Sequence, residues 1–414
     1  MQVWTAIKNH YFTTGCLLLC LGFPLFGVTP AFMSIGTVVC TLAFFHGNIA
    51  DNLKKLTSLP VLLFIILWVW ILIGGLYSTD TKRWWDICSR KLPLLLLPLG
   101  FASVSLTKKQ VWGILLFFNG VITFFAIAST IYYFNHFEAI NASLIESKAV
   151  PVWPVEDGIS HIYFGVLMSF SIVNCLYFTL TEKQPVLFNR DRILFCGLGL
   201  LNFVIIHLLS ARTGLVALYG GLGVLILYTV WQYRRVKMVW LTLVILPLIP
   251  VIAYAALPSF RNKIINSVKD IEINRSGGDI NHRSFSMRLE AWKTGIDIIE
   301  QHPVTGMGPG DLYREMHAQY DRNQTILWHE NRVMPHNQFI ENGVQLGLLY
   351  VLLLLIVVFW PLLHYKQTNP LQWCVSALFF FAMCFESLLE RQIGVTAFPL
   401  VVFLTGYLGS NKNL

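Results

Sequence analysis

Three single residues and one basic cluster carry the side chains from which we expect chemistry. His336 follows Pro335 where a long polar segment ends and a long apolar run begins. Its imidazole titrates near neutral pH, so it can accept or donate a proton at the start of a helix. Arg212 lies between two apolar runs joined by almost no turn, where an arginine usually faces a polar cavity. Arg288 lies near the start of an amphipathic segment. Because a helix start disfavours cations, we expect Arg288 to bind an anion there.

The basic cluster falls between the third and fourth apolar runs and consists of Lys82, Arg83, Arg90 and Lys91. Arginine suits phosphate because its planar guanidinium forms bidentate, charge-assisted hydrogen bonds. Plainer interpretations stay open: a helix-capping histidine, an arginine bonded to helix-end carbonyls, a solvated charge, or cations that reach lipid headgroups. The chemical interpretation predicts an outward-facing cavity with His336 for proton transfer and, for phosphate, Arg212, Arg288, Arg83 and Arg90.

Composition predicts the class of protein that positions these residues. The 414-residue chain is 55% hydrophobic and 13% charged, whereas an ordinary soluble domain is about 25% charged. We therefore predict an all-α polytopic membrane protein. The net charge of +8 does not indicate nucleic-acid binding, because the basic residues are scattered between apolar runs. The eight cysteines lack metal-ligand spacing, and no nucleotide-binding or metalloprotease motif is present, so we expect no metal and no cofactor.

Apolar runs near the length that a bilayer requires, roughly 20 residues, predict about twelve transmembrane helices. The first run lacks an obvious small-residue cleavage site, so we interpret it as a helix and not as a removed signal peptide. The predicted helices lie near 12–28, 31–47, 60–77, 92–106, 111–133, 160–180, 193–210, 214–230, 239–256, 337–363, 371–388 and 394–409.

The short loops predict the orientation of the chain. An arrangement with both termini in the cytoplasm satisfies the positive-inside rule. The loop at 134–159, which this arrangement places outside, is net acidic. The basic cluster at 82–91 breaks the rule, which favours a functional role for it. The cations assigned to the inside are Lys54, Lys55, Lys108, Lys109, Lys183, Arg190, Arg192, Arg234, Arg235, Lys237, Lys366 and Lys412.

The largest feature is a polar segment at 257–335, predicted to lie outside. Apolar residues recur at helical spacing over 286–299, which predicts an amphipathic helix that ends at His302-Pro303. A glycine-rich turn follows at 306–310, and a second short helix is expected at 311–320. We therefore divide this single integral membrane unit into 1–256 with nine helices, the loop 257–335, and 336–414 with three helices.

The sequence resembles the bacterial O-antigen ligase and O-antigen polymerase superfamily over about 195–360. His336-Asn337, nine residues, Gly347, two residues and then Tyr350 fit the ligase pattern. The segments around Arg288 and Arg212 resemble the family's two arginine sites. Family membership implies a membrane glycosyltransferase similar to the GT-C class, with Asn337, Gly347 and Tyr350 supporting the catalytic histidine.

The resemblance implies a metal-independent, inverting glycosyl transfer at the periplasmic face of the bacterial inner membrane. The donor would be a glycan on undecaprenyl pyrophosphate, and the acceptor a hydroxyl of lipid A–core, with membrane lipids around the enzyme. His336 would take the proton of the acceptor as attack proceeds. Three alternatives remain: an O-antigen polymerase, a protein O-oligosaccharyltransferase and a lipid-linked glycan transporter. Transporters tend to contain repeats and broken helices, and the sequence shows neither.

Overall fold

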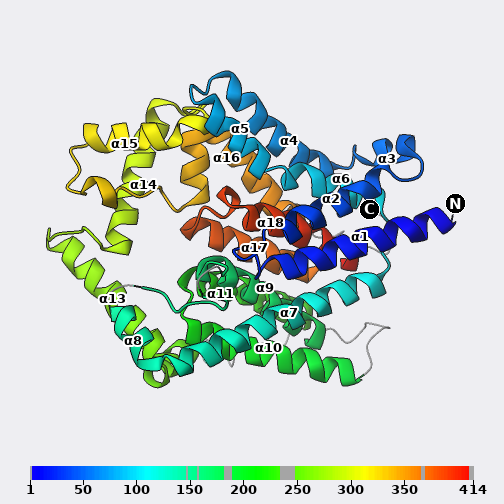
Figure 1. The fold of residues 1–414 in the computed structure, drawn as a ribbon, viewed down its shortest axis with the longest axis horizontal. Coiled ribbons are helices and arrows are strands. Elements are labelled where there is room, and N and C mark those ends of the chain that lie inside the picture. Colours follow the sequence, from blue (N-terminus) through cyan, green and yellow to red (C-terminus); the bar gives the residue numbers. More distant parts are fainter. Residues whose placement is uncertain are drawn as a thin grey trace.

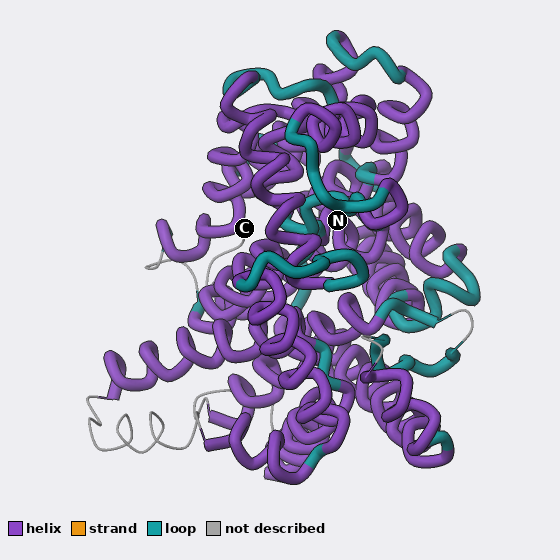
Figure 2. Tube along the Cα trace, turned by 90° about the vertical axis from the view of Figure 1, so that its left-hand side faces the viewer, coloured by secondary structure: helices purple, strands orange, loops and turns teal. Residues whose placement is uncertain are grey.

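A computed structural model describes residues 2–145, 148–155, 158–180, 189–233, 248–364 and 369–409. All secondary structure in these residues is helical, and they contain no strand (Figures 1 and 2). The predicted all-α class is therefore confirmed. Part of the predicted helix at 239–256 lies outside the described residues, as do Lys183, Arg234, Arg235, Lys237, Lys366 and Lys412.

Among the described residues, helices α1 to α11 precede the large loop and supply most of the apolar core. In Figure 1, α7 and α10 lie along the lower edge, and α9 and α11 lie between them and the centre. The bounds are α1 (Gln2–Gly22), α2 (Ala31–Phe45), α3 (Ile49–Lys55), α4 (Leu59–Ile73), α5 (Thr81–Arg90), α6 (Pro93–Ser103), α7 (Lys108–Asn135), α8 (Phe137–Ile145), α9 (His161–Leu180), α10 (Asn189–Leu209) and α11 (Arg212–Tyr233).

The remaining helices form the large loop and the C-terminal part of the core. Residues 248–256 are also helical and lead directly into α13. The bounds are α13 (Pro258–Arg275), α14 (Ser284–Gln301), α15 (Leu312–Arg322), α16 (Gln338–Leu363), α17 (Pro370–Phe385) and α18 (Gln392–Gly409), with short 3₁₀ turns η1 (Gly74–Leu76), η2 (Pro309–Asp311), η3 (His329–Asn331) and η4 (Leu388–Glu390).

Six helices among the described residues are long and apolar enough to cross a membrane, or seven if α2 and α3, bent by 110°, form one broken span. This indicates a membrane protein, but the predicted number of about twelve spans is not confirmed. The predicted runs at 92–106 and 371–388 form α6 and α17, which have 11 and 16 residues. At 1.5 Å per residue, 11 residues reach about 16 Å, roughly half of a 30 Å hydrocarbon layer.

The large loop contains three helices. The two predicted ones are confirmed as α14 and α15, and α14 ends at His302 as expected. The sequence analysis missed α13, an 18-residue helix whose mean hydropathy is low. It joins α8 to α14 at the left edge of the molecule in Figure 1. The loop is therefore a packed helical layer over the membrane helices.

The predicted histidine helix is broken. Within α16, Gly347 has φ 79° and ψ 175°, which interrupts the helical hydrogen bonds after about two and a half turns. Backbone N–H groups of Met307 and Gly308 donate to the carbonyls of Val344 and Gln345 at 2.8 and 3.0 Å. This corrects our expectation that the chain lacks broken helices.

Candidate active site

The start of α16 fixes the backbone on both sides of His336. Asn337 caps the helix: its side-chain oxygen accepts the N–H groups of Phe339 and Ile340, and its amide donates to the Cys384 carbonyl at 2.9 Å. His336 itself has φ 47°, a left-handed conformation that costs a non-glycine residue about 1–3 kcal/mol. Such a conformation persists where the surrounding contacts determine it, as they do here.

Trp292 holds the other side of the histidine. Its indole N–H donates to the carbonyl of Pro335 at 2.6 Å, which ties α14 to the residue before His336. The sequence analysis used Trp292 only as a member of the apolar face of this helix. The contact shows a second role: the amphipathic helix of the large loop positions the histidine backbone.

Glu386 is the ionisable group next to the histidine. Its Oε1 lies 3.0 Å from Nδ1 of His336, and its side chain is 8% exposed, whereas that of His336 is 36% exposed. A carboxylate at this distance accepts the Nδ1 proton and so favours the tautomer whose Nε2 lone pair is free to accept a proton. The sequence analysis missed Glu386 because it lies 50 residues after His336, directly after the apolar run of α17, and has no local motif.

Arg288 approaches the same carboxylate. Its Nη2 lies 3.6 Å from Glu386 Oε2, and its Nη1 donates to the carbonyl of Phe385 at 2.9 Å. Burial lowers the pKa of the guanidinium and Glu386 opposes that effect. An arginine side chain remains charged in proteins. A guanidinium has five N–H donors, which leaves donors available for an anion.

Arg212 begins α11, which packs against α9 and α17. Its Nη1 donates to Ser267 Oγ of α13 at 3.0 Å. Electrostatic interactions connect it to Arg288, and connect His161 at the start of α9 to Arg212, Lys263, Arg288 and Glu386. The structure thus brings Arg212, Arg288 and His336 into one region, and adds His161 and Lys263 to it. Burial, followed by the nearby Arg212, lowers the pKa of Lys263 to about 8.

The basic cluster lies around α5, apart from the two arginines. The Arg83 guanidinium sits over the ring of Tyr313 in α15, 5.2 Å from its centroid. Arg90 donates to the backbone carbonyl of Glu390 at 3.1 Å, and buried Lys91 forms an ion pair with the Glu390 carboxylate at 2.6 Å. These contacts join α5 to α15 and η4. Phosphate binding by Arg83 and Arg90 stays a prediction.

A buried polar stripe connects the histidine region to the ion pair of Lys91. Gln338, Glu341 and Asn342 lie on α16 before its break and are at most 5% exposed. Gln338 donates to Glu390 at 3.1 Å and to Asn342 at 3.0 Å, and Ser387 donates to Glu341. The segment from Glu386 to Glu390 therefore holds α16, α5 and α14 together through side chains.

Gly347 and Tyr350, the last two residues of the predicted pattern, have structural roles. A Cβ at Gly347 would lie 2.1 Å from the carbonyl oxygen of Val304, so only glycine permits this backbone approach. Leu348 donates its N–H to the Pro303 carbonyl at 2.8 Å. Tyr350 is 1% exposed and packs against Trp70 with ring centroids 6.1 Å apart. Neither residue touches His336 directly.

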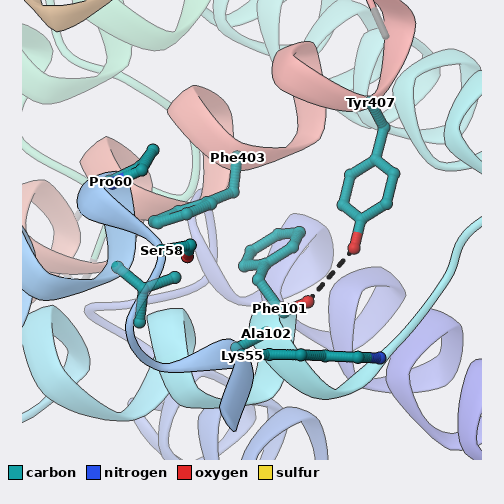
Figure 3. Close-up of a pocket in the computed structure, with 8 residues that line it drawn as sticks. Lys55, Ser58, Pro60, Phe101, Ala102, Phe403 and Tyr407 are labelled. Carbon is teal, nitrogen blue, oxygen red and sulfur yellow. Dashed lines mark hydrogen bonds between the residues drawn. The ribbon is translucent and has the colours of Figure 1, made fainter. Parts of the chain in front are cut away.

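Cavities also lie away from this site, and one of about 500 Å³ is lined by Tyr11, Val39, Leu42, Phe45 and His46. Another cavity lies between α3, α4, α6 and α18, where the Tyr407 hydroxyl donates to the Phe101 carbonyl at 3.1 Å (Figure 3), and its volume is about 20 Å³. That volume holds roughly one water molecule and no sugar. Among the residues that the structure describes, no group of three or more His, Cys, Asp or Glu side chains is placed to hold a metal ion.

Comparison with known proteins identifies the region that carries the site. Residues 197–355 match the family model described as O-antigen ligase. This region belongs to the O-antigen ligase superfamily. The resemblance drawn from the sequence is confirmed, and the ligase-family region contains Arg212, Arg288 and His336. Members of the family are glycosyltransferase-like enzymes of the ligase and polymerase type, which act on lipid-linked glycans and glycan acceptors.

One curated relative is similar to part of the chain. It is an uncharacterized protein of Haemophilus influenzae that is 24% identical over 208 residues. The match covers 49% of this chain and 50% of the relative, so the chain spans about half the length of that protein. This similarity carries no function of its own.

Proposed function

We propose that this protein is an O-antigen ligase-type glycosyltransferase. It would move a glycan from undecaprenyl pyrophosphate to a hydroxyl of lipid A–core, at the periplasmic face of the inner membrane. The observation that carries the proposal is the partly exposed His336, whose Nδ1 lies 3.0 Å from the buried Glu386, a carboxylate that Arg288 also approaches. This is a general base with its orienting carboxylate, next to a cation for a leaving anion.

In the proposed reaction the oxygen of the acceptor hydroxyl attacks the anomeric carbon of the donor sugar. The bond between that carbon and the pyrophosphate oxygen breaks, and its electron pair leaves with the pyrophosphate. His336 takes the hydroxyl proton on Nε2, and Glu386 stabilises the imidazolium through Nδ1. A single displacement from the face opposite the leaving group inverts the anomeric configuration. Proton transfer of this kind typically contributes about 10²–10⁴ in rate.

The leaving group determines the role of the arginines. Negative charge grows on the pyrophosphate as the bond breaks, and fixed cations stabilise it more in the transition state than in the ground state. Arg212 and Arg288 are proposed to bind the pyrophosphate. Arg83 and Arg90 are weaker candidates because their contacts, to Tyr313 and to the Glu390 carbonyl, place them apart from the other two arginines. The reaction is proposed to need neither a metal nor a nucleotide.

The alternatives differ in the acceptor or in the class of protein. An O-antigen polymerase would use another lipid-linked glycan, and a protein O-oligosaccharyltransferase a protein hydroxyl. The break in α16 is one observation that favours a transporter. However, the carbonyls freed at Gly347 accept N–H groups from the 303–308 loop, which favours a structural joint over an ion site.

The experiment that tests the proposal offers the purified protein three acceptors. Undecaprenyl pyrophosphate-linked oligosaccharide is incubated with lipid A–core, with a second lipid-linked glycan, or with an acceptor protein. Glycosylated lipid A is the expected product. Longer lipid-linked glycan alone would make the protein a polymerase, and glycosylated protein alone an oligosaccharyltransferase. Movement of the donor across proteoliposomes without any transfer would contradict the enzymatic proposal.

A further inference from the structure

Three of the four buried residues of helix α13 are polar, and the fourth is Phe260. Three polar residues on one face are buried: Ser259, Lys263 and Asp270 are 0%, 7% and 2% exposed. On the other face Ile264 and Ile265 are 40% and 48% exposed. A helix that lies between a protein core and water shows the opposite pattern, with apolar residues inside and polar residues outside.

The buried face is polar because it bonds to the elements around the candidate site. Ser267 accepts from Arg212 at 3.0 Å, and Ser259 donates to the Leu208 carbonyl at 2.7 Å. Asp270 lies 3.6 Å from Arg283, and Lys263 donates to the Lys148 carbonyl. Thus α13 forms one wall of the region that contains Arg212.

A second exposed apolar surface precedes the exposed isoleucines of α13, with exposed Arg261 between the two. Residues 248–256 are helical and largely apolar, and they expose Val251 at 63% and Ile252 at 62%. Only Leu257 separates this helix from α13. The exposed apolar residues of α13 end at Val268, and the same face then carries Glu272 and Arg275.

We propose that the N-terminal half of α13, residues 258–268, is an interfacial helix whose outer face lies in the lipid bilayer, while its C-terminal half rises into water. Exposed Arg261 and Lys269 flank the apolar patch, and such cations reach lipid phosphates from the interface. The partner of this surface is the bilayer. A second protein is disfavoured because the patch follows the exposed apolar residues of 248–256.

This placement has a consequence that rests on the proposed function. The donor is anchored in the bilayer by its isoprenoid chain, and its pyrophosphate lies at the interface. A wall that is apolar toward lipid and polar toward Arg212 lets the pyrophosphate reach that arginine from the plane of the membrane. The location of α13 itself does not depend on which glycan is transferred.

The test measures the depth of two positions on the same face of α13. Single cysteines replace Ile265 and Glu272 in the full chain, in which the two native cysteines that are not fully buried, Cys196 and Cys384, are changed to serine. Each is labelled with a nitrobenzoxadiazole fluorophore, and the protein is placed in phosphatidylcholine–phosphatidylglycerol vesicles. The positions are seven residues apart, about 10 Å along the helix.

A nitroxide on the acyl chains is expected to quench the label at 265 at least threefold more strongly than the label at 272. Aqueous iodide should show the reverse order. Equal quenching of both labels by either agent, or stronger iodide quenching at 265, would overturn the proposal. If the Ile265→Cys variant does not fold, Val268→Cys replaces it. Because neither readout involves transfer, failure of the proposed function leaves this result interpretable.

Discussion

Replacement of Glu386 by glutamine tests the base directly. The change keeps the shape of the side chain and removes the charge that Nδ1 of His336 meets at 3.0 Å. Hydrogen bonds to charged groups contribute about 1.5–3 kcal/mol, which corresponds to a loss of about 10- to 150-fold in kcat. The loss grows if the glutamine amide donates to Nδ1 and stabilises the unproductive tautomer, an effect that costs serine proteases about 10⁴.

The same change should not weaken binding of the donor. Arg288 lies 3.6 Å from the second oxygen of Glu386, so loss of that negative charge releases its guanidinium for the pyrophosphate. We expect a lower kcat with a KM that is unchanged or reduced. The assay is transfer from the lipid-linked donor to lipid A–core at varied donor concentration, with Glu386→Asp as the charge-retaining control and exposed Glu330→Gln as the matched distant control. Glu386→Gln with native kcat and a native pH profile would refute the assigned role.

Three further predictions concern the elements around the histidine. Gly347→Ala should lower the free energy of unfolding by roughly 2–4 kcal/mol, because its Cβ has no space and its φ is positive; a thermal midpoint equal to that of the neighbouring exposed Leu348→Ala would contradict this. Trp292→Phe removes the hydrogen bond that holds the carbonyl before His336 and should reduce kcat about fivefold, from about 1 kcal/mol, with little change in KM; a change confined to KM would argue against positioning. Lys263 has a pKa of about 8 against an ordinary 10.5, so its charge is lost as pH rises through 8. The donor KM should therefore rise between pH 7 and 9 in the native protein and stay flat in Lys263→Gln. The stability contribution of this group increases over pH 8–10.5, because the unfolded chain binds more protons there. Parallel KM profiles in the two proteins would exclude a role for this charge.

Local patterns in the sequence were sufficient for the features that depend on local physics. The apolar periodicity of 286–299 predicted α14 because a helix with one apolar face repeats every 3.6 residues. The spacing from His336 to Tyr350 indicated the family, which the match over 197–355 confirms. Both signals lie within a single segment, where spacing along the chain determines spacing in the fold.

The features that were missed depend on contacts between distant segments. Glu386 meets His336 only because α17 packs against α16, and no local pattern distinguishes it from a carboxylate at a helix end. Helix α13 has low mean hydropathy, so a search for apolar runs does not detect this helix. The span count also depended on helix length, and the predicted run at 92–106 forms only the 11-residue α6.

The measurement that tests the central claim most directly is transfer in vitro with and without the His336 imidazole. Purified protein is mixed with undecaprenyl pyrophosphate-linked oligosaccharide and lipid A–core in excess EDTA, without nucleotide. Glycosylated lipid A should form with the native chain and fall by at least about 10² in the His336→Ala variant that still folds. Undiminished product from that variant, or product that appears only when a divalent metal is restored, would contradict the account.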